Sequence, residues 1–306
     1  MAAATLSERI AFWELDTEGE EQSTTVLHSV RPCIRTSGVV DIGIFDEPQD
    51  IRTLVKEADT KPGGKYHSVL KLFFRVGTSP TWLTATGWLL KDDLVVTAAH
   101  CVYDSGERAT CARACIEFAE PNSTSGSNSQ QRSVSRIALP LEWINTEADK
   151  HDVAFLKLTS PFWDATPIPW DSPEIHARQQ LTVVGYPTDL GKGGEPGGKM
   201  YQMTIDHEID LERTKMNLLM YQGDLQGGLS GAPVLRDRDH VAIGVHIRGG
   251  SFNTAAVISG VHGVKFRVYE EVMGMLGRQG VSDSGLEVQN HVGNNWLKYV
   301  DVPCNP

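Results

Sequence analysis

The feature that most constrains the fold is a succession of short β-type runs that begins at Lys65. Each run is rich in Val, Ile, Leu, Thr and aromatic residues, and clusters of Gly, Pro, Asn and Asp separate most of them. Because about a dozen short strands follow one another without long helical patterns, the sequence predicts an all-β sandwich or barrel. The expected strands are Ser68–Val76, Trp82–Leu90, Leu94–Ala98, Ala112–Phe118, Val134–Leu139, Val153–Leu158, Gln180–Val184, Met200–His207, Met216–Tyr221, Ala232–Leu235, Val241–Ile247 and Ala255–Val261.

Three further regions lie outside this β-rich stretch. Residues 1–62 are predicted to form an N-terminal extension, interpreted as a pro-segment, a docking arm or extra strands, with a strand at Val39–Phe45 and a short helix near Ile51–Ala58. A proline and paired glycines then interrupt regular structure. Lys265–Leu276 is the one clear helical pattern, because its apolar residues repeat on one stripe, and residues 277–306 form a polar tail.

The charge balance and hydropathy of the 306 residues exclude several classes of protein. The sequence has 28 Lys and Arg against 39 Asp and Glu, and the net charge of −11 argues against nucleic acid or an anionic membrane as the main partner. No run of about 18 apolar residues occurs, so no segment is expected to span a bilayer. Charged residues interrupt the apolar residues of Met1–Asp16, so no secretory signal is visible and the sequence predicts an intracellular protein.

The five cysteines do not have the pattern of a disulfide framework. Their number is odd and they are unevenly spread, so we expect thiols in a reducing compartment rather than a set of bridges. No Cys/His pair follows Cys111 and Cys115 at the spacing of metal ligands, and the sequence predicts no metal site. The cysteines are Cys33, Cys101, Cys111, Cys115 and Cys304.

Three local sequences point to one chemistry. TAAHC contains His100, HDVAFLKL contains Asp152 and GGLSGAPV contains Ser230. A serine hydroxyl is a weak nucleophile until a base removes its proton, and that base needs a partner that holds it in one tautomer. The oxyanion that develops on the substrate needs backbone N–H groups beside small residues. Each motif alone has an ordinary structural explanation, but together they predict a triad of His100, Asp152 and Ser230, with the amides of Gly228 and Ser230 as the oxyanion hole.

These motifs resemble the signature blocks of chymotrypsin-like serine peptidases, and the resemblance extends over about Tyr66 to Leu276. The chain order His, Asp, Ser separates this family from α/β-hydrolases and subtilisins, which reach the same chemistry in other orders. The resemblance implies a peptidase domain over residues 63–276, made of two antiparallel six-stranded β-barrels and a C-terminal helix. The first barrel would span about residues 65–165 and the second about 178–264, with the active site in the cleft between them.

Within that family the chain is most similar to the glutamyl endopeptidase, or V8-like, branch. The sequences VVGYP and GVH, the second ending at His246 and followed by Gly249, resemble segments of that branch. There a histidine at the base of the specificity pocket receives the acidic P1 side chain, which precedes the scissile bond. The resemblance implies that His246 binds substrate, with Leu225, Gly249 and Asn253 at further pocket positions, and that cleavage follows Glu or Asp. The alternative is a core histidine on a central strand.

The chain also departs from the pattern of that branch. Leu225 stands where a threonine is usual, and Leu229 stands before the serine in place of Asn, Gln or Asp. Without an aspartate there, the trypsin-type pairing with a new N-terminal amine cannot form. The pocket-wall segment Phe252–Val257 has alanines where the family has Gly and Thr, which narrows a pocket and removes a hydrogen bond. Cys101 follows the histidine as in trypsins, but no cysteine lies at its expected partner position near Thr86.

The sequence therefore predicts a serine endopeptidase that acts on polypeptides, needs no cofactor or metal, and binds neither nucleic acid nor membrane. Similar peptidases are generally secreted, which stands against the intracellular placement. Two alternatives remain open, because a fold does not fix a substrate. One is a catalytically inactive, protease-like binding module, and the other is an esterase that uses the same triad. The oligomeric state is not predicted.

Overall fold

The computed structural model describes most of the β-rich stretch and parts of both terminal regions. The predicted strand at Val39–Phe45 and the predicted pocket residue Leu225 lie outside the described residues. The described residues are 7–15, 30–32, 51–118, 129–174, 176, 178–189, 198–209, 218–222, 227–249, 252–259, 263–276, 287–291 and 296–303.

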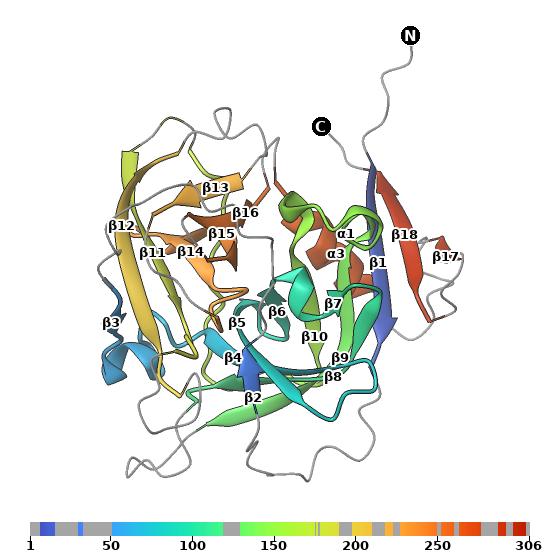
Figure 1. The fold of residues 1–306 in the computed structure, drawn as a ribbon, viewed down its shortest axis with the longest axis horizontal. Helices are drawn as coiled ribbons and strands as arrows, with labels where there is room; N and C mark the ends of the chain where they lie inside the picture. Colours follow the sequence, from blue (N-terminus) through green and yellow to red (C-terminus); the bar gives the residue numbers. More distant parts are fainter. Residues whose placement is uncertain are drawn as a thin grey trace.

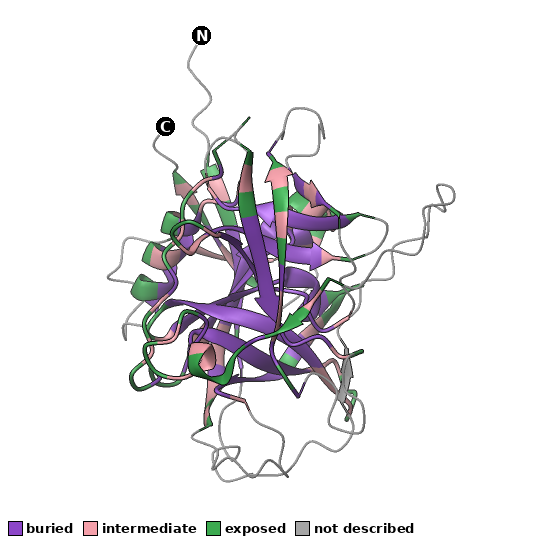
Figure 2. Cartoon of the chain, turned by 90° about the vertical axis from the view of Figure 1, so that its left-hand side faces the viewer, coloured by how far each residue is buried: buried purple, intermediate pink, exposed green. Residues whose placement is uncertain are grey.

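Six antiparallel strands form a first, closed barrel. They follow the order β9-β10-β6-β5-β4-β8, and pairing of β8 with β9 closes the ring. Closure leaves no open edge within the ring, and most residues of these strands are buried. Figure 2 shows that the strands of the molecule are mostly buried, with exposed residues toward their ends and in the loops. The strands are β4 (Val69–Val76), β5 (Trp82–Lys91), β6 (Leu94–Thr97), β8 (Glu107–Ile116), β9 (Gln130–Pro140) and β10 (Ala154–Leu158).

Residues from both terminal regions extend the sheet of this first barrel. On the right of Figure 1, β1 pairs with β9, β18 pairs with β1, and β17 pairs with β18, all antiparallel. β2 runs parallel to β5, and β7 forms a short ladder with β8. These strands are β1 (Ser7–Glu14), β2 (Val30–Pro32), β7 (Tyr103–Asp104), β17 (Val288–Asn290) and β18 (Lys298–Pro303).

The second barrel is a curled sheet on the left of Figure 1. Its order is β13-β16-β15-β14-β11-β12, and β3 adds to the edge at β12. Among the described residues no pairing joins β12 to β13, so this unit is a half-barrel. The strands are β3 (Thr53–Leu54), β11 (Arg178–Gly185), β12 (Tyr201–Glu208), β13 (Leu218–Tyr221), β14 (Pro233–Arg236), β15 (Val241–Arg248) and β16 (Asn253–Val257).

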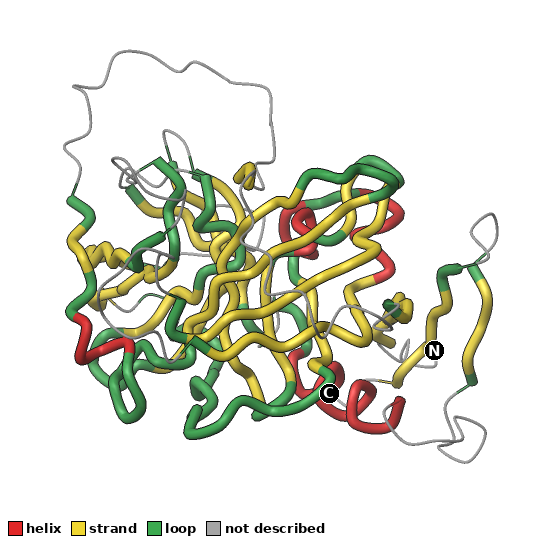
Figure 3. The backbone as a smooth tube through the Cα atoms, turned by 90° about the horizontal axis from the view of Figure 1, so that it is seen from below, coloured by secondary structure: helices red, strands yellow, loops and turns green. Residues whose placement is uncertain are grey.

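Within the described residues helical segments are short and few, and Figure 3 shows that strands make up most of the regular structure. The predicted helix over Lys265–Leu276 forms as α3, but the helix expected near Ile51–Ala58 is wrong. That stretch forms β3 and a 3₁₀ turn instead, since the backbone of Thr53 pairs with β12 and tertiary pairing overrides a weak local propensity. No helix within the described ranges has the length and apolar character needed to cross a membrane. The helices are α1 (Leu141–Thr146), α3 (Phe266–Leu276) and the 3₁₀ segments η1 (Glu57–Thr60), η2 (Ala99–Cys101) and η3 (Asp149–His151).

Helix α3 follows the second barrel in sequence but packs on the first. The ring of Phe266, fully buried, stacks on Trp88 of β5 at 6.0 Å and meets Phe155 of β10 edge-on at 5.0 Å. Tyr269, one turn further along the helix, stacks on Phe155 at 4.2 Å. Aromatic contacts of this kind add to the free energy gained by burying apolar surface, so α3 fastens the end of the second barrel to the first.

Replacing Phe266 by alanine is expected to lower the free energy of unfolding by about 3–5 kcal/mol, because the change removes a fully buried ring and leaves a cavity. Chemical denaturation measures this loss. Met275 on the same helix is 37% exposed, so Met275→Ala is the matched control and should cost less than about 0.5 kcal/mol. Equal effects of the two substitutions would contradict the proposed fastening role of α3.

Candidate active site

His100, Asp152 and Ser230 lie in one chain of hydrogen bonds, although they are far apart in the sequence. The Nδ1 atom of His100 is 2.8 Å from Asp152 Oδ2, and its Nε2 atom is 2.9 Å from Ser230 Oγ. The backbone N–H of His100 also donates to Asp152 Oδ1 at 2.8 Å. Because a carboxylate only accepts, Nδ1 carries the ring proton and the Ser230 hydroxyl donates to Nε2. The imidazole is thereby held in one tautomer, with its basic nitrogen facing the hydroxyl.

This group of residues spans the junction of the two barrels. His100 lies in η2 directly after β6, and Asp152 lies between η3 and β10, so both come from the first barrel. Ser230 comes from the loop at residues 227–231, called here the serine loop, which precedes β14 of the second barrel. Asp152 is fully buried, His100 is 4% exposed and Ser230 is 8% exposed, so solvent reaches the group from the serine side.

Two glycines of the serine loop adopt backbone conformations that other residues rarely take. The angle φ is +94° at Gly228 and +87° at Gly231. A Cβ at Gly231 would clash with the carbonyl of Thr86 and the hydroxyl of Thr97 in the first barrel, and a Cβ at Gly228 would clash with the carbonyl of Tyr186. The loop therefore fits against its neighbours only with glycine at both positions.

Thr86 of β5 joins the first barrel to the serine loop. Its hydroxyl donates to the carbonyl of Gly228 at 2.8 Å and accepts the backbone N–H of Tyr186 at 3.0 Å. Its backbone N–H donates to the carbonyl of Ser230 at 3.0 Å, and its carbonyl accepts the hydroxyl of Thr97 at 2.8 Å. Thr86 is fully buried, where such bonds are costly to break. Sequence analysis did not identify this residue, since a threonine within a β-type run is ordinary.

Leu229 anchors the serine loop from the other side. Its side chain is 2% exposed and belongs to the apolar core of the second barrel, together with Val183 and Ile243. Full burial of a leucine side chain contributes about 1.5–3 kcal/mol. Leu229, which departs from the family pattern, is the residue before Ser230. Packing in the apolar core therefore holds this position, rather than an ion pair.

His246 of β15 lies against the serine loop. Its backbone carbonyl accepts the N–H of Gly231 at 2.7 Å, and its Nδ1 atom is 2.7 Å from the hydroxyl of Tyr221. Burial, and to a smaller extent the charge of nearby His100, lowers the pKa of His246 to about 3. Burial also raises the pKa of the Tyr221 phenol well above its usual value. The imidazole is therefore neutral near pH 7 and rests against a protonated phenol.

The remaining predicted pocket residues lie on or next to neighbouring strands. Asn253 is fully buried at the start of β16, directly opposite Tyr221 in the antiparallel register. Gly249 follows the end of β15, and Leu225 lies outside the described residues. The structure thus brings Asn253 and His246 together around Tyr221. Sequence analysis placed Tyr221 in a strand and gave it no role in the site.

An ion pair crosses from one barrel to the other beside this site. Arg248, two positions beyond His246, donates through Nη2 to Oδ2 of Asp149, which lies three positions before Asp152. Both side chains are mostly buried, so solvent screens the pair less than a surface ion pair. It ties the end of β15 to the turn that carries Asp152.

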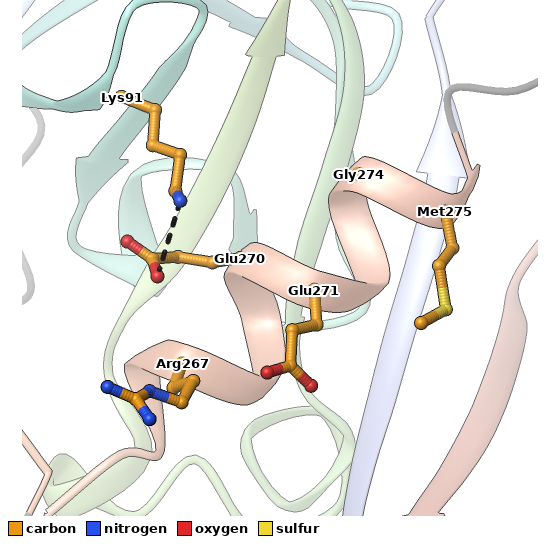
Figure 4. A pocket seen from close by; sticks show the side chains of 6 residues that line it. All are labelled: Lys91, Arg267, Glu270, Glu271, Gly274 and Met275. Carbon is orange, nitrogen blue, oxygen red and sulfur yellow. Dashed lines mark ion pairs between the residues drawn. The ribbon is translucent and has the colours of Figure 1, made fainter.

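Two pockets of about 470 Å³ each contain none of the three hydrogen-bonded residues. One lies along α3, where Figure 4 shows Glu270 turned toward Lys91, with Arg267 and Met275 on the same helix. Lys91 Nζ is 3.6 Å from Oε2 of Glu270. The other lies between β12 and β13 and includes Tyr221. Within the ranges that the structure describes, no three His, Cys, Asp or Glu residues group as metal ligands.

A family model described as a trypsin-like peptidase domain matches residues 85–245. The chain belongs to this family of trypsin-like peptidases. The matched stretch contains His100, Asp152 and Ser230, and it ends one residue before His246.

Individual relatives are more distant. Glutamyl endopeptidase of Bacillus licheniformis is 25% identical over 185 residues, which cover 60% of this chain and 52% of that protein. The chain thus matches about half the length of this relative. A solved Glu endopeptidase in complex with MPD gives a TM-score of 0.58 at 21% identity, over 74% of this chain and 97% of that chain. An inactivated protease paralogue of the scabies mite gives 0.54 at 19% identity, over 72% and 98%. The predicted chymotrypsin-like fold is confirmed.

Replacing Thr86 by valine is expected to lower the free energy of unfolding by about 1–3 kcal/mol, because it keeps the shape but leaves a buried N–H and a buried carbonyl without a hydroxyl partner. Thr86→Ser keeps the hydroxyl and is the matched control, with an expected loss of about 1 kcal/mol for the missing methyl. Denaturant unfolding of both variants measures these two losses of stability. A serine variant less stable than the valine variant would show that the hydroxyl does not hold the loop.

His246 is expected to make the protein less stable in mild acid. Between its ordinary pKa of 6.5 and its lowered pKa of about 3, the unfolded chain binds a proton at His246 that the folded chain does not. The free energy of unfolding that depends on the neutral His246 is fully present above pH 6.5, and it falls as the pH falls from 6.5 toward about 3. Between pH 7 and pH 5, wild type should lose about 2 kcal/mol more than His246→Gln in denaturant unfolding. Equal losses of stability in wild type and His246→Gln would contradict a lowered pKa at His246.

Proposed function

We propose that the protein is a serine endopeptidase in which Ser230 is the nucleophile, His100 is the general base and acid, and Asp152 orients His100. The observation that carries the proposal is the unbroken chain of hydrogen bonds from Asp152 through His100 to Ser230, at 2.8 and 2.9 Å. Membership of the trypsin-like peptidase family supports a polypeptide substrate. The chemistry requires only groups that the chain itself supplies.

In the proposed first half of the reaction, Ser230 Oγ bonds to the carbonyl carbon of the scissile peptide while its proton passes to His100 Nε2. Asp152 stabilises the imidazolium through its bond to Nδ1. The tetrahedral intermediate then breaks its C–N bond, and His100 gives the proton to the departing amine. In the second half, water attacks the acyl-enzyme with His100 again as the base, which releases the acid product and restores the hydroxyl of Ser230.

The backbone N–H groups of Gly228 and Ser230 form the proposed oxyanion hole. The preceding carbonyls are both held: that of Gly227 accepts from Thr188, and that of Leu229 accepts the N–H of Ala232 at 2.9 Å. These peptides are trans, and in a trans peptide the N–H points opposite to the carbonyl. The two donors are therefore fixed in direction before substrate arrives, which is what lowers the barrier at a developing oxyanion.

We further propose that His246 forms the base of a pocket that prefers glutamate, or aspartate, at P1. The relative named glutamyl endopeptidase supports this preference. The neutral imidazole has its Nδ1 atom against the Tyr221 hydroxyl, which leaves a proton on Nε2 when the phenol donates. A substrate carboxylate would accept that N–H, and its negative charge would raise the pKa of His246 and favour uptake of a proton.

A protease-like binding module without activity is the second candidate. The solved structures with this fold include an inactivated protease paralogue, so the fold alone does not imply catalysis. The hydrogen bond at 2.9 Å between His100 and Ser230 favours the enzyme. An esterase that uses the same residues is the third candidate, and comparison of peptide and ester turnover separates it from a peptidase.

The test is cleavage-site mapping with wild type, Ser230→Ala and the control Ser79→Ala, whose serine is exposed. Each protein is incubated with a denatured protein mixture, and new termini are read by mass spectrometry. Wild type and Ser79→Ala should cut, while Ser230→Ala should lose activity by about 10⁴-fold or more, because the nucleophile is gone.

Cuts after Glu or Asp that vanish in Ser230→Ala would support both the triad and the acidic pocket. Cuts elsewhere that vanish in that variant would keep the peptidase and remove the P1 preference. Wild type that cuts nothing and does not react at Ser230 with a fluorophosphonate would overturn the enzyme in favour of the binding module.

A further inference from the structure

The segment at residues 51–66, called here the strap, connects the N-terminal region to both barrels. On the second barrel, β3 pairs with β12, and the N–H of Val55 donates to the carbonyl of Met200 at 3.0 Å. Figure 1 shows β3 and the following turn beside β12, before the chain enters β4. The strap is thus bonded to the sheet that carries the serine loop.

Arg52 is the charged anchor of the strap on the second barrel. Its Nη1 and Nη2 atoms donate to the two carboxylate oxygens of Asp189 at 2.9 and 2.7 Å. The Arg52 side chain is only 3% exposed, and two parallel bonds between guanidinium and carboxylate fix direction as well as distance. Asp189 lies in the loop after β11, directly beside Thr188.

Thr188 connects Asp189 to the serine loop. Its backbone N–H and its hydroxyl both donate to the carbonyl of Gly227 at 2.8 Å. Since the N–H of Gly228 points opposite to that carbonyl across a trans peptide, Thr188 sets the direction of one oxyanion-hole donor. A rotated Gly227–Gly228 peptide would turn this donor away and present a carbonyl in its place.

A second charged anchor fixes the strap to the first barrel. Lys61 Nζ lies 3.1 Å from Oε2 of Glu117, whose other oxygen is 3.1 Å from Nε2 of His67. The Glu117 side chain is almost fully buried at the end of β8. Held at both ends, the strap presents Arg52 from a fixed position rather than from a loose arm.

We propose that Arg52 is a positioning residue for the oxyanion hole, acting through Asp189 and Thr188 on the Gly227–Gly228 peptide. This rests on the proposed peptidase activity. Because Leu229 precedes the serine, the serine loop has no carboxylate at that position to pair with a cation. The ion pair is formed instead by Arg52 and Asp189, in the neighbouring loop after β11. Residues 51–62 are then a working part of the peptidase, and their removal would lower its activity rather than raise it.

The test compares wild type, Arg52→Ala, Asp189→Ala and the charge swap that combines Arg52→Asp with Asp189→Arg. Each single variant should lower kcat by about 10-fold with KM nearly unchanged, less than the loss of a whole oxyanion donor. The swap should recover most of the lost kcat, because it restores the pair between the strap and the loop after β11. The matched control is Arg178→Ala, which breaks an exposed Arg–Asp pair with Asp206 at the other end of β11 and should leave kcat unchanged.

Amide hydrogen exchange gives a readout that does not depend on turnover. Peptides covering residues 186–189 and 227–232 should exchange faster in Arg52→Ala than in wild type, and at the wild-type rate in Arg178→Ala. If wild type proves inactive, the proposed function fails, and the exchange rates still decide whether Arg52 orders the serine loop. Arg52→Ala with kcat within twofold of wild type, or with unchanged exchange at residues 227–232, would overturn the inference.

Discussion

The hydrogen bonds of Thr86 join the two barrels at the serine loop. One buried residue of β5 bonds to the carbonyls of Gly228 and Ser230, and also to the N–H of Tyr186. The serine loop therefore takes its position from the first barrel, which also carries His100 and Asp152. Ser230 Oγ of the second barrel can then lie 2.9 Å from the imidazole of His100 in the first. The reason is that the serine loop is bonded to β5, and β5 pairs with β6, the strand that precedes His100.

The serine loop is held from several directions by interactions of different kinds. Leu229 packs into the apolar core of the second barrel, Gly231 leaves room for the first barrel, and Thr188 bonds to the carbonyl of Gly227. Burial is not directional, whereas a hydrogen bond to a peptide carbonyl fixes the plane of that peptide. Packing thus keeps the loop in place, and the polar contacts decide which way its N–H groups face.

The sequence predicted the features that leave a local signature. Short β-type runs, a helix at Lys265–Leu276 and three motifs around His100, Asp152 and Ser230 were each visible within a few residues. Thr86, Tyr221 and Arg52 were missed because their importance comes from partners remote in sequence, and a threonine or arginine in isolation predicts nothing. The helix expected near Ile51–Ala58 was wrong for the same reason, since β12 supplies the bonds that make part of that stretch a strand.

The pairing of β1 with β18 brings together residues nearly 300 positions apart, such as Ser7 and Pro303. A ribosome adds about 5–20 residues each second, so β1 waits on the order of 15–60 s before its partner strand exists. During that time β9 can cover one edge of β1, while the other edge offers unpaired N–H and C=O groups to any neighbouring chain. The nascent protein therefore keeps one edge of β1 open through most of translation, and the pairing of β18 closes it.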